Sequence, residues 1–424
     1  MIIQIAEKDK AKLNLIIAYY RRLFEITNDA FTMKNFVIDK YGTPTCSITT
    51  LSRLENNKIE SYDSTYFSLL DKLQMKYYSD PKIDVILHEA NLAILQHAEF
   101  NHAKAIIDLI QNIFTHYGKY RNYAIYHEQF DVYDIVMDYY AHYQFNPDII
   151  DKMNELIELV DDCLRPILIE ITFIYYTRIN MNGQEALNTL EKVKCCHTNS
   201  IIKEYVDLLL SYRKYELTAN KEKAENLIKK CQVIQNKFYY CKACNILSVI
   251  YTVQNPKKAA EYLLESIQHF DHQYDISQNL CVYHKNLAIT ACCNLEDYEL
   301  ALKHFEACFQ LDEQILIITF PYYIYSLEVT HKSIEKIREL LIDISFFEDM
   351  MEPTTFIHIF HLMQLKYNLT KKYTINTLIN EFIKSKEIIK QVSPLLKIIE
   401  NEIYDICEKS DDLKIYSHFV KIFH

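Results

Sequence analysis

Apolar residues recur every three to four positions along most of the chain, which is the spacing of one face of an α-helix. Between Lys10 and Ile26, for example, Leu13, Ile16 and Ile17 fall on one face of a predicted helix. The chain contains only 3 glycines and 8 prolines, far fewer turn residues than a β-rich fold requires. The sequence therefore predicts an all-α protein.

Three more helices are predicted before residue 78. The second begins after Thr32, which is expected to cap it, and ends at Gly42. A turn follows, and the third helix spans Ile48–Asn56 with Ser47 as its N-cap. The fourth begins near Asp63. Residues 1–78, the head, are therefore expected to form a small domain of four helices.

The third helix has the most informative pattern in the chain. Leu51 and Leu54 lie three residues apart and face a core, which leaves short polar and basic groups on the outer side. The pair Asn56-Asn57 tolerates the left-handed conformation that closes a helix. A short helix with a polar outer face, ending in a tight turn, indicates a helix-turn-helix that contacts DNA.

This segment resembles the phage-repressor or Xre type of helix-turn-helix over about 60 residues. The family pattern Ser-Arg-Ile-Glu-Asn-Gly-Lys is matched from Ser52 to Lys58, with Leu54 in place of Ile and Asn57 in place of Gly. The turn before the third helix is about three residues longer than in the family, and the second helix lacks the usual pair of small residues.

The resemblance implies that the third helix enters the major groove by its N-terminal residues. Base edges would be approached by Ser47, Ile48, Thr49 and Thr50. Arg53 and Lys58 would reach phosphate or guanine, and Thr32 and Lys34 would lie at the DNA backbone. The alternative is that these are ordinary surface charges on a small helical cap.

The charge is distributed unevenly. The chain has a formal net charge of −11, yet the head holds 11 Lys/Arg against 9 Asp/Glu, while the remaining residues hold 35 and 48. A mildly basic head on an acidic body suits a nucleic-acid reader attached to a domain that avoids phosphate. The twelve cysteines are scattered through predicted helices without a signal peptide, so we expect reduced thiols, a cytoplasmic location and no membrane span.

A helical repeat is predicted after the head. Small residues at Ala186, Ala224, Ala260 and Ala301 are spaced 38, 36 and 41 residues apart, each followed by apolar residues at four and seven positions downstream. Ala103 gives a fifth, earlier copy. The spacing fits pairs of helices, so a repeat array is expected over residues 82–371, with closing helices over 372–424.

The best copy, from Asn286 to Cys308, resembles the tetratricopeptide repeat. In members of that family that bind extended peptides, an Asn at the position of Asn245 and Asn286 bonds the ligand backbone. Further residues at helical spacing on the same faces complete the predicted peptide site: Lys242, Ser248, Thr252, Tyr283 and Thr290. The alternative for the two asparagines is a ladder of side-chain bonds between adjacent helices.

No catalytic, cofactor or metal site is expected. The pair Cys241 and Cys244 lies inside a predicted helix without a second pair at zinc spacing, and His269/His272 and His358/His361 lack a carboxylate constellation. Three isolated glycines cannot form a phosphate-binding loop.

A Xre-type head before a tetratricopeptide-like array resembles the Rgg, PlcR, PrgX and arbitrium-receptor group of peptide-sensing regulators. The resemblance implies a homodimeric, non-enzymatic transcription factor whose DNA binding is controlled by a short signalling peptide, as in quorum sensing. Three alternatives remain open: an array that inhibits a partner protein while the head serves as a docking module, a repressor or toxin–antitoxin regulator that needs no ligand, and, with the least support, an enzyme.

Overall fold

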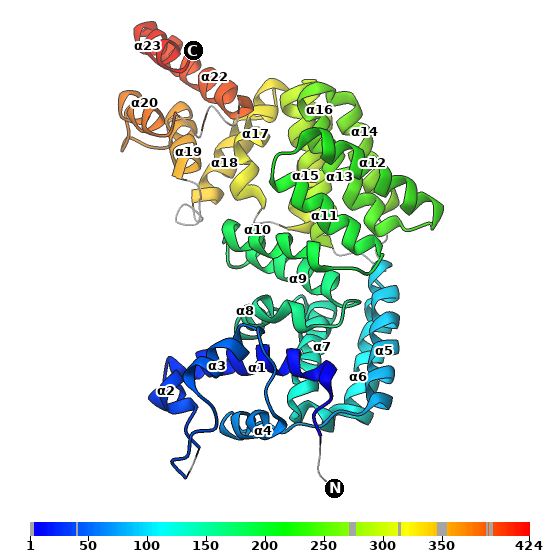
Figure 1. The fold of residues 1–424 in the computed structure, drawn as a ribbon. Coiled ribbons are helices and arrows are strands. Elements are labelled where there is room, and N and C mark those ends of the chain that lie inside the picture. Colours follow the sequence, from blue (N-terminus) through cyan, green and yellow to red (C-terminus); the bar gives the residue numbers. More distant parts are fainter. Residues whose placement is uncertain are drawn as a thin grey trace. The chain divides into compact units, whose positions relative to one another are not determined.

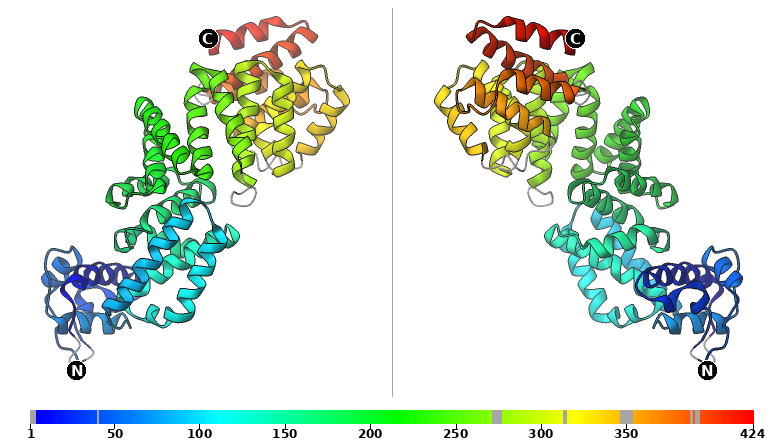
Figure 2. Two further views of the ribbon diagram at one scale, coloured as in Figure 1. Left: turned by 90° about the vertical axis from the view of Figure 1, so that its right-hand side faces the viewer. Right: turned by 90° about the vertical axis from the view of Figure 1, so that its left-hand side faces the viewer.

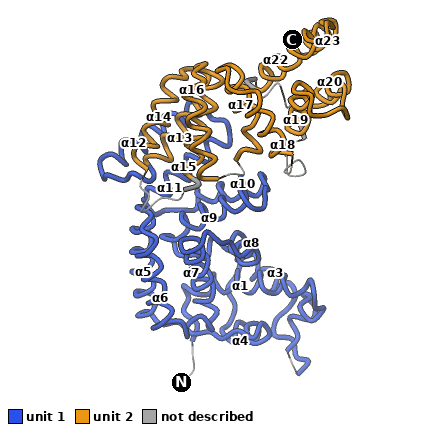
Figure 3. The backbone as a smooth tube through the Cα atoms, turned by 180° about the vertical axis from the view of Figure 1, so that it is seen from behind, with its two compact units in different colours: residues 1–239 blue, residues 240–424 orange. Residues whose placement is uncertain are grey.

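The computed structural model describes residues 4–39, 41–270, 277–312, 315–345, 354–386, 389 and 393–424. These residues form helices and no strand, so the prediction of an all-α chain is confirmed (Figure 1). None of the helices in the described ranges is long and apolar enough to cross a membrane. Backbone contacts divide the chain into two compact units, Met1–Tyr239 and Tyr240–His424 (Figure 3).

The head contains four α-helices and one turn of 3-10 helix. In chain order they are α1 (Glu7–Glu25), η1 (Asp29–Phe31), α2 (Met33–Phe36), α3 (Ile48–Glu55) and α4 (Asp63–Lys72). The first, third and fourth agree with the predicted helices.

The second helix differs from its prediction, because α2 is a single turn of four residues and does not reach Gly42. Thr32 stands at its N-cap but does not cap it; the threonine hydroxyl donates to the carbonyl oxygen of Asp29 at 2.9 Å. The expectation that Thr32 caps a helix extending to Gly42 is therefore wrong.

A short hairpin replaces the missing part of that helix. The amide of Asp39 donates to the carbonyl of Thr43 at 2.8 Å, and the carboxylate of Asp39 accepts from the amides of Tyr41 and Thr43. Gly42 has a φ of +80°, which glycine adopts without strain. Local bonds from the aspartate side chain thus satisfy backbone groups that a continued helix would otherwise have used.

The head packs on the helices that follow it. Helix α1 lies against α7 (Ala124–His142), as both ribbon views show (Figures 1 and 2). The buried hydroxyl of Tyr20 donates to Glu128 at 2.8 Å, and the amide of Ala124 donates to the carbonyl of Lys76 at 2.8 Å. The head and the helices up to residue 239 therefore belong to one compact unit.

Successive helices pack in pairs through the rest of the first unit. They are α5 (Pro81–Glu99), α6 (Ala103–Tyr117), η2 (Gly118–Asn122), α7, α8 (Pro147–Leu156), η3 (Ile157–Leu159), α9 (Arg165–Arg178), α10 (Gly183–Glu191), η4 (Lys192–Cys195), α11 (Ile201–Arg213) and α12 (Leu217–Val233).

The second unit continues the pattern, beginning within α13 (Lys237–Gln254). Its further helices are α14 (Pro256–His269), α15 (Ser277–Thr290), the π-helical turn η5 (Ala291–Leu295), α16 (Tyr298–Leu311), α17 (Ile315–Val329), α18 (Ile334–Ile344), α19 (Thr354–Lys366), α20 (Ile375–Lys384), α22 (Ser393–Lys409) and α23 (Leu413–Phe423).

The small residues of the predicted repeat lie in the second helix of their pairs. Ala186, Ala224, Ala260 and Ala301 fall in α10, α12, α14 and α16, and all four are buried. Ala103, by contrast, begins α6 and is half-buried. Pairing continues beyond Asp312, where the sequence pattern fades: α19 packs on α20, although the predicted boundary at residue 371 falls between them.

Candidate nucleic-acid interface

Helix α3 begins where its sequence predicts and ends one residue earlier, with Asn56 as its C-cap. The hydroxyl of Ser47 accepts from the amide of Thr50 at 3.0 Å, which satisfies one of the free donors at the helix N-terminus. Leu51 and Leu54 are fully buried against the head core. Asn57 has a φ of 53°, the left-handed conformation expected for the residue that follows the helix.

A buried ion pair fixes α3 against α1. The guanidinium of Arg21 binds the Glu55 carboxylate through two nitrogens, Nε to Oε1 and Nη2 to Oε2, the latter at 3.0 Å. A third donor, Nη1, reaches the carbonyl of Phe31 at 3.1 Å. Because both charged side chains are at most 4% exposed, the pair replaces lost hydration with charge-assisted bonds and sets the position of the C-terminal end of α3.

The loop after α3 is held by a second polar contact. The amide of Asn14 donates to Asn57 at 2.9 Å and to the carbonyl of Ile59 at 3.2 Å, while Tyr66 donates to the Asn14 oxygen at 2.9 Å. Helices α1 and α4 thus hold the turn that follows α3 in place, and the position of α3 on the head is fixed at both its buried face and its C-terminal end.

The predicted DNA-contacting side chains of α3 lie on that outer face. Ser47, Ile48, Thr49 and Arg53 are exposed, and Thr50 is half-buried beside the Ser47 hydroxyl. The only carboxylate within α3 is Glu55, which is buried with its partner. The exposed surface of the helix is therefore free of negative charge.

Three cations of α2, α3 and the turn that follows α3 lack a counter-charge within the described part of the chain. Lys34, Arg53 and Lys58 are exposed, and none of them forms an ion pair with any residue in the described ranges. Other cations of the head are committed to carboxylates: Lys8, Lys10 and Arg21. Unpaired cations beside a carboxylate-free helix make a surface that attracts phosphate.

Lys72, a cation near α2, is not available to bind phosphate. Its ammonium group donates to the carbonyl of Asn35 at 2.9 Å and lies 5.5 Å from the centroid of the Phe36 ring. Burial lowers the pKa of Lys72. Its contacts are those of a residue that ties α4 to α2.

The two asparagines predicted to bind peptide contact each other. The amide nitrogen of Asn286 on α15 donates to the amide oxygen of Asn245 on α13 at 2.9 Å. Both side chains are half-buried. This is the bond between neighbouring helices that the sequence left open as the alternative to a ligand contact.

The remaining predicted peptide contacts lie mainly in the helix packing. Lys242, Ser248, Tyr283 and Thr290 are at most 9% exposed, so a ligand cannot reach them in this conformation. Thr252 is half-buried, and its hydroxyl donates to the carbonyl of Ser248 at 2.8 Å. Of the seven residues, Asn245, Asn286 and Thr252 retain a solvent-facing side.

The cysteine pair set aside in the sequence, and one of the histidines, make bonds within the helix packing. Cys241 and Cys244 are buried in α13, and the Cys241 thiol donates to the carbonyl of Ser266 at 3.4 Å. His269 bonds the carbonyl of Glu265 within its own helix, while His272 lies outside the described residues.

The sequence analysis did not predict the Arg21–Glu55 ion pair. The sequence does contain a signal for it, because Arg21 follows Ile17 by four residues and Glu55 follows Leu51 by four, which places both charges on buried helix faces.

Comparison with models of known protein families gave no match, and comparison with curated proteins found no significant similarity.

Proposed function

We propose that the chain is a DNA-binding transcriptional regulator whose head works as a helix-turn-helix. The observation that carries the proposal is the outer face of α3, where a capped and anchored helix displays short polar side chains without a carboxylate. In such a motif the N-terminal residues of the helix reach base edges, here Ser47, Thr49 and Thr50. Arg53 suits guanine or phosphate because its guanidinium offers paired donors.

Affinity would come chiefly from phosphate contacts by the unpaired cations. Each cation that neutralises a phosphate releases condensed counterions, so binding weakens as the salt concentration rises. Lys34 and Lys58 stand at opposite ends of the α2–α3 segment and are suited to the two flanking stretches of backbone. One short helix reads few bases, so the proposal includes a homodimer that presents two heads to two half-sites.

We further propose that the array controls DNA binding by taking up a short peptide. The Asn245–Asn286 bond uses one donor hydrogen and one acceptor lone pair, and each amide keeps further hydrogen-bonding capacity on its half-exposed side. A peptide backbone offers the matching donor and acceptor. Thr252, one helical turn beyond Ser248, is half-buried and adds a side chain with a solvent-facing side.

A repressor that needs no ligand is the second candidate. The bond between Asn245 and Asn286 favours this candidate, because the two amides already satisfy each other in part. The burial of four of the seven predicted peptide-binding residues favours it as well. The two candidates share the DNA-binding head and differ in whether a peptide changes its affinity.

The test is fluorescence anisotropy of the full chain with labelled duplex from upstream of its own gene, against a duplex of scrambled sequence. Arg53→Ala should weaken binding by about 1–3 kcal/mol and reduce the preference for the specific duplex. Lys58→Ala should weaken both duplexes and lower the salt slope by about one. Lys104→Ala is the matched control, since Lys104 is an exposed cation of α6 outside the head.

A chain that binds neither duplex at low salt would contradict DNA binding altogether. If the specific duplex binds and short peptides leave its affinity unchanged, the ligand-independent repressor is favoured over the peptide-controlled regulator.

A further inference from the structure

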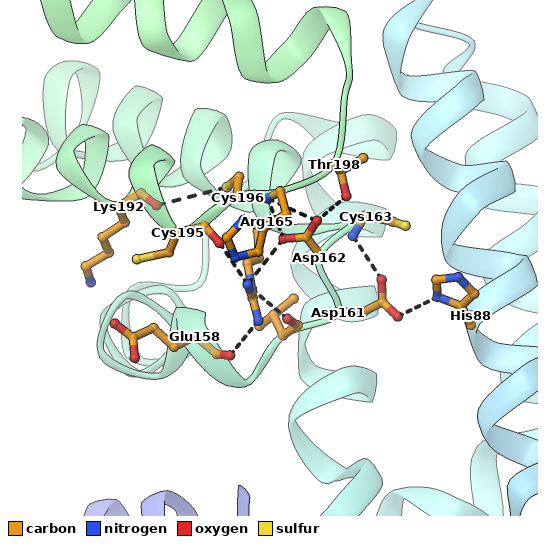
Figure 4. Close-up of polar contacts among 12 residues, drawn as sticks. His88, Glu158, Asp161, Asp162, Cys163, Arg165, Lys192, Cys195, Cys196 and Thr198 are labelled. Atoms are coloured by element: carbon orange, nitrogen blue, oxygen red, sulfur yellow. Dashed lines mark hydrogen bonds and ion pairs between the residues drawn. The ribbon is translucent and has the colours of Figure 1, made fainter. Parts of the chain in front are cut away.

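Three side chains with different metal-binding groups converge in the first unit, outside the head. His88 comes from the middle of α5, and Asp161 and Cys163 come from the short segment between η3 and α9 (Figure 4). One imidazole nitrogen, one carboxylate oxygen and one sulfur all lie within 4.8 Å of one another. His88 lies more than 70 positions before Asp161 and Cys163, so only the fold brings it to them.

The carboxylate of Asp161 stands at the centre of the group. Its Oδ2 lies 2.9 Å from Nδ1 of His88, and its Oδ1 accepts from the backbone amide of Cys163 at 2.9 Å. The second bond holds the aspartate side chain in the orientation that meets the histidine. In Figure 4 the Cys163 sulfur points toward the same side as His88, whereas the Cys195 sulfur points away from it.

The segment that carries Asp161 and Cys163 is held rigidly. Arg165 donates to the carbonyls of Val160 at 2.8 Å, Glu158 at 2.7 Å and Cys195 at 3.0 Å. The neighbouring Asp162 accepts from the amide of His197 at 3.0 Å. Ligands on a fixed backbone bind a metal more tightly, because little freedom is lost when the ion arrives.

The donor set selects the kind of ion. Calcium and magnesium take oxygen ligands, whereas nitrogen and sulfur together favour zinc. Zinc bonds are about 2.0–2.3 Å long, so shifts of about 1 Å bring the three atoms around one ion. Cys163 is 4% exposed and His88 is exposed, so the group has a buried side and an open side. The open side leaves a fourth coordination position for water.

We propose that His88, Asp161 and Cys163 form a zinc-binding site that links α5 to the segment before α9. This site goes beyond the proposed function and does not depend on it. The competing explanation is that His88 and Asp161 form a hydrogen-bonded tether in which the nearby thiol takes no part. A tether of that kind has no use for zinc, so metal binding separates the two.

The experiment uses the full chain, freed of metal with a chelator and titrated with zinc against a chromogenic zinc indicator. One zinc ion per chain is expected, together with a zinc-dependent rise in melting temperature, because the ion binds the folded chain. With cobalt as the probe, a sulfur-to-metal charge-transfer band is expected in the near ultraviolet. This band reports on the thiolate directly.

Two variants and two controls test the assignment. Cys163→Ala should abolish the cobalt–sulfur band, and His88→Ala should weaken zinc binding at least about tenfold, the loss typical of removing a metal-supporting group. His88→Ala guards against misfolding, since its side chain is 55% exposed. The controls Cys195→Ala and His116→Ala remove a thiol and an imidazole outside the group and should bind zinc like the unmodified chain.

Failure to take up zinc at micromolar concentrations would overturn the proposal. It would also be overturned if His88→Ala and Cys163→Ala bound zinc as tightly as the unmodified chain. A cobalt complex without the charge-transfer band would exclude Cys163 as a ligand and refute the site as stated. None of these measurements involves DNA, so they are independent of the proposed regulator.

Discussion

Removing one partner of the Arg21–Glu55 pair should strongly destabilise the packing of α3. In Arg21→Met the Glu55 carboxylate would lose two charge-assisted bonds and stay 3% exposed, and the carbonyl of Phe31 would lose its donor. Breaking a buried ion pair by deleting one member costs about 3–5 kcal/mol, because an uncompensated charge is left in a poorly solvated site. The double variant Arg21→Met/Glu55→Leu removes both charges and should recover most of that loss. A residual cost of about 1 kcal/mol is expected from the Phe31 carbonyl.

Hydrogen exchange of the α3 amides in the full chain measures this effect locally, which suits a chain with two compact units better than one melting temperature. Arg22→Ala is the matched control, since Arg22 is the exposed neighbour on α1 and its loss should change exchange by less than about 0.5 kcal/mol. The reasoning fails if Arg21→Met costs less than about 1 kcal/mol. It also fails if the double variant is as unstable as the sum of the single variants, because the two charges would then be uncoupled.

Three further changes have directions set by the structure. Ser47→Ala should lower the local stability of α3 by about 1 kcal/mol, seen as faster amide exchange, and Ser47→Asp should restore it because Asp also caps helices. Asn286→Ala removes the donor to Asn245 and should lower the melting temperature, at a cost of about 0.5–1.5 kcal/mol; an unchanged melting temperature would show that the bond does not join α13 to α15. Burial, reinforced by the charge of Glu328, raises the pKa of Glu402 to about 8. Between pH 4.5 and 8 the folded chain therefore keeps a proton on Glu402 that the unfolded chain releases, because the ordinary pKa of a glutamate is 4.5. The free energy of unfolding should fall as the pH rises through this window, by at most about 1.4 kcal/mol per pH unit, and Glu402→Gln should flatten that dependence.

Features governed by local sequence were predicted well. The register of α3 follows from Leu51 and Leu54, three residues apart, and its start follows from a serine whose side chain can reach the third amide of the helix. Ala224 and Ala301, small residues of the predicted repeat, are buried in their helices, because a small residue is needed wherever two helices pack closely. In each case the physical cause lies within about one turn of the residue.

The predicted second helix of the head is too long, and the reason is also local. Residues after Phe36 keep an apolar pattern that fits a helix, but Asp39 offers its carboxylate to two backbone amides and Gly42 adopts a positive φ. The two conformations compete for the same backbone donors, and the periodicity of apolar residues does not report on that competition. The hairpin contacts that join Val37 to Thr45 and Asp39 to Thr43 could therefore not be predicted from the apolar pattern.

Contacts between distant positions were the least accessible from the sequence. Asn245 and Asn286 occupied equivalent repeat positions, which predicted that they lie on adjacent helices but not whether they bind each other or a ligand. His88 and Asp161 shared no pattern at all, since no repeat links the middle of α5 to the segment before α9. Their meeting depends on how several helix pairs stack.

Within the proposed function, the contact of the head with α7 and α8 determines how a bound peptide could move the head. Tyr20 is buried and bonds Glu128, whose other carboxylate oxygen lies 3.1 Å from the ammonium of Lys152 on α8. The same ammonium pairs with Asp131 and lies 5.1 Å from the centroid of the Tyr20 ring. Freeing the head would take the Tyr20 hydroxyl from Glu128, which keeps Lys152 as its partner, and would expose the buried Tyr20 ring to water. Within the proposed function, a peptide is therefore expected to act by moving the head together with α7 and α8 as one body rather than by releasing it.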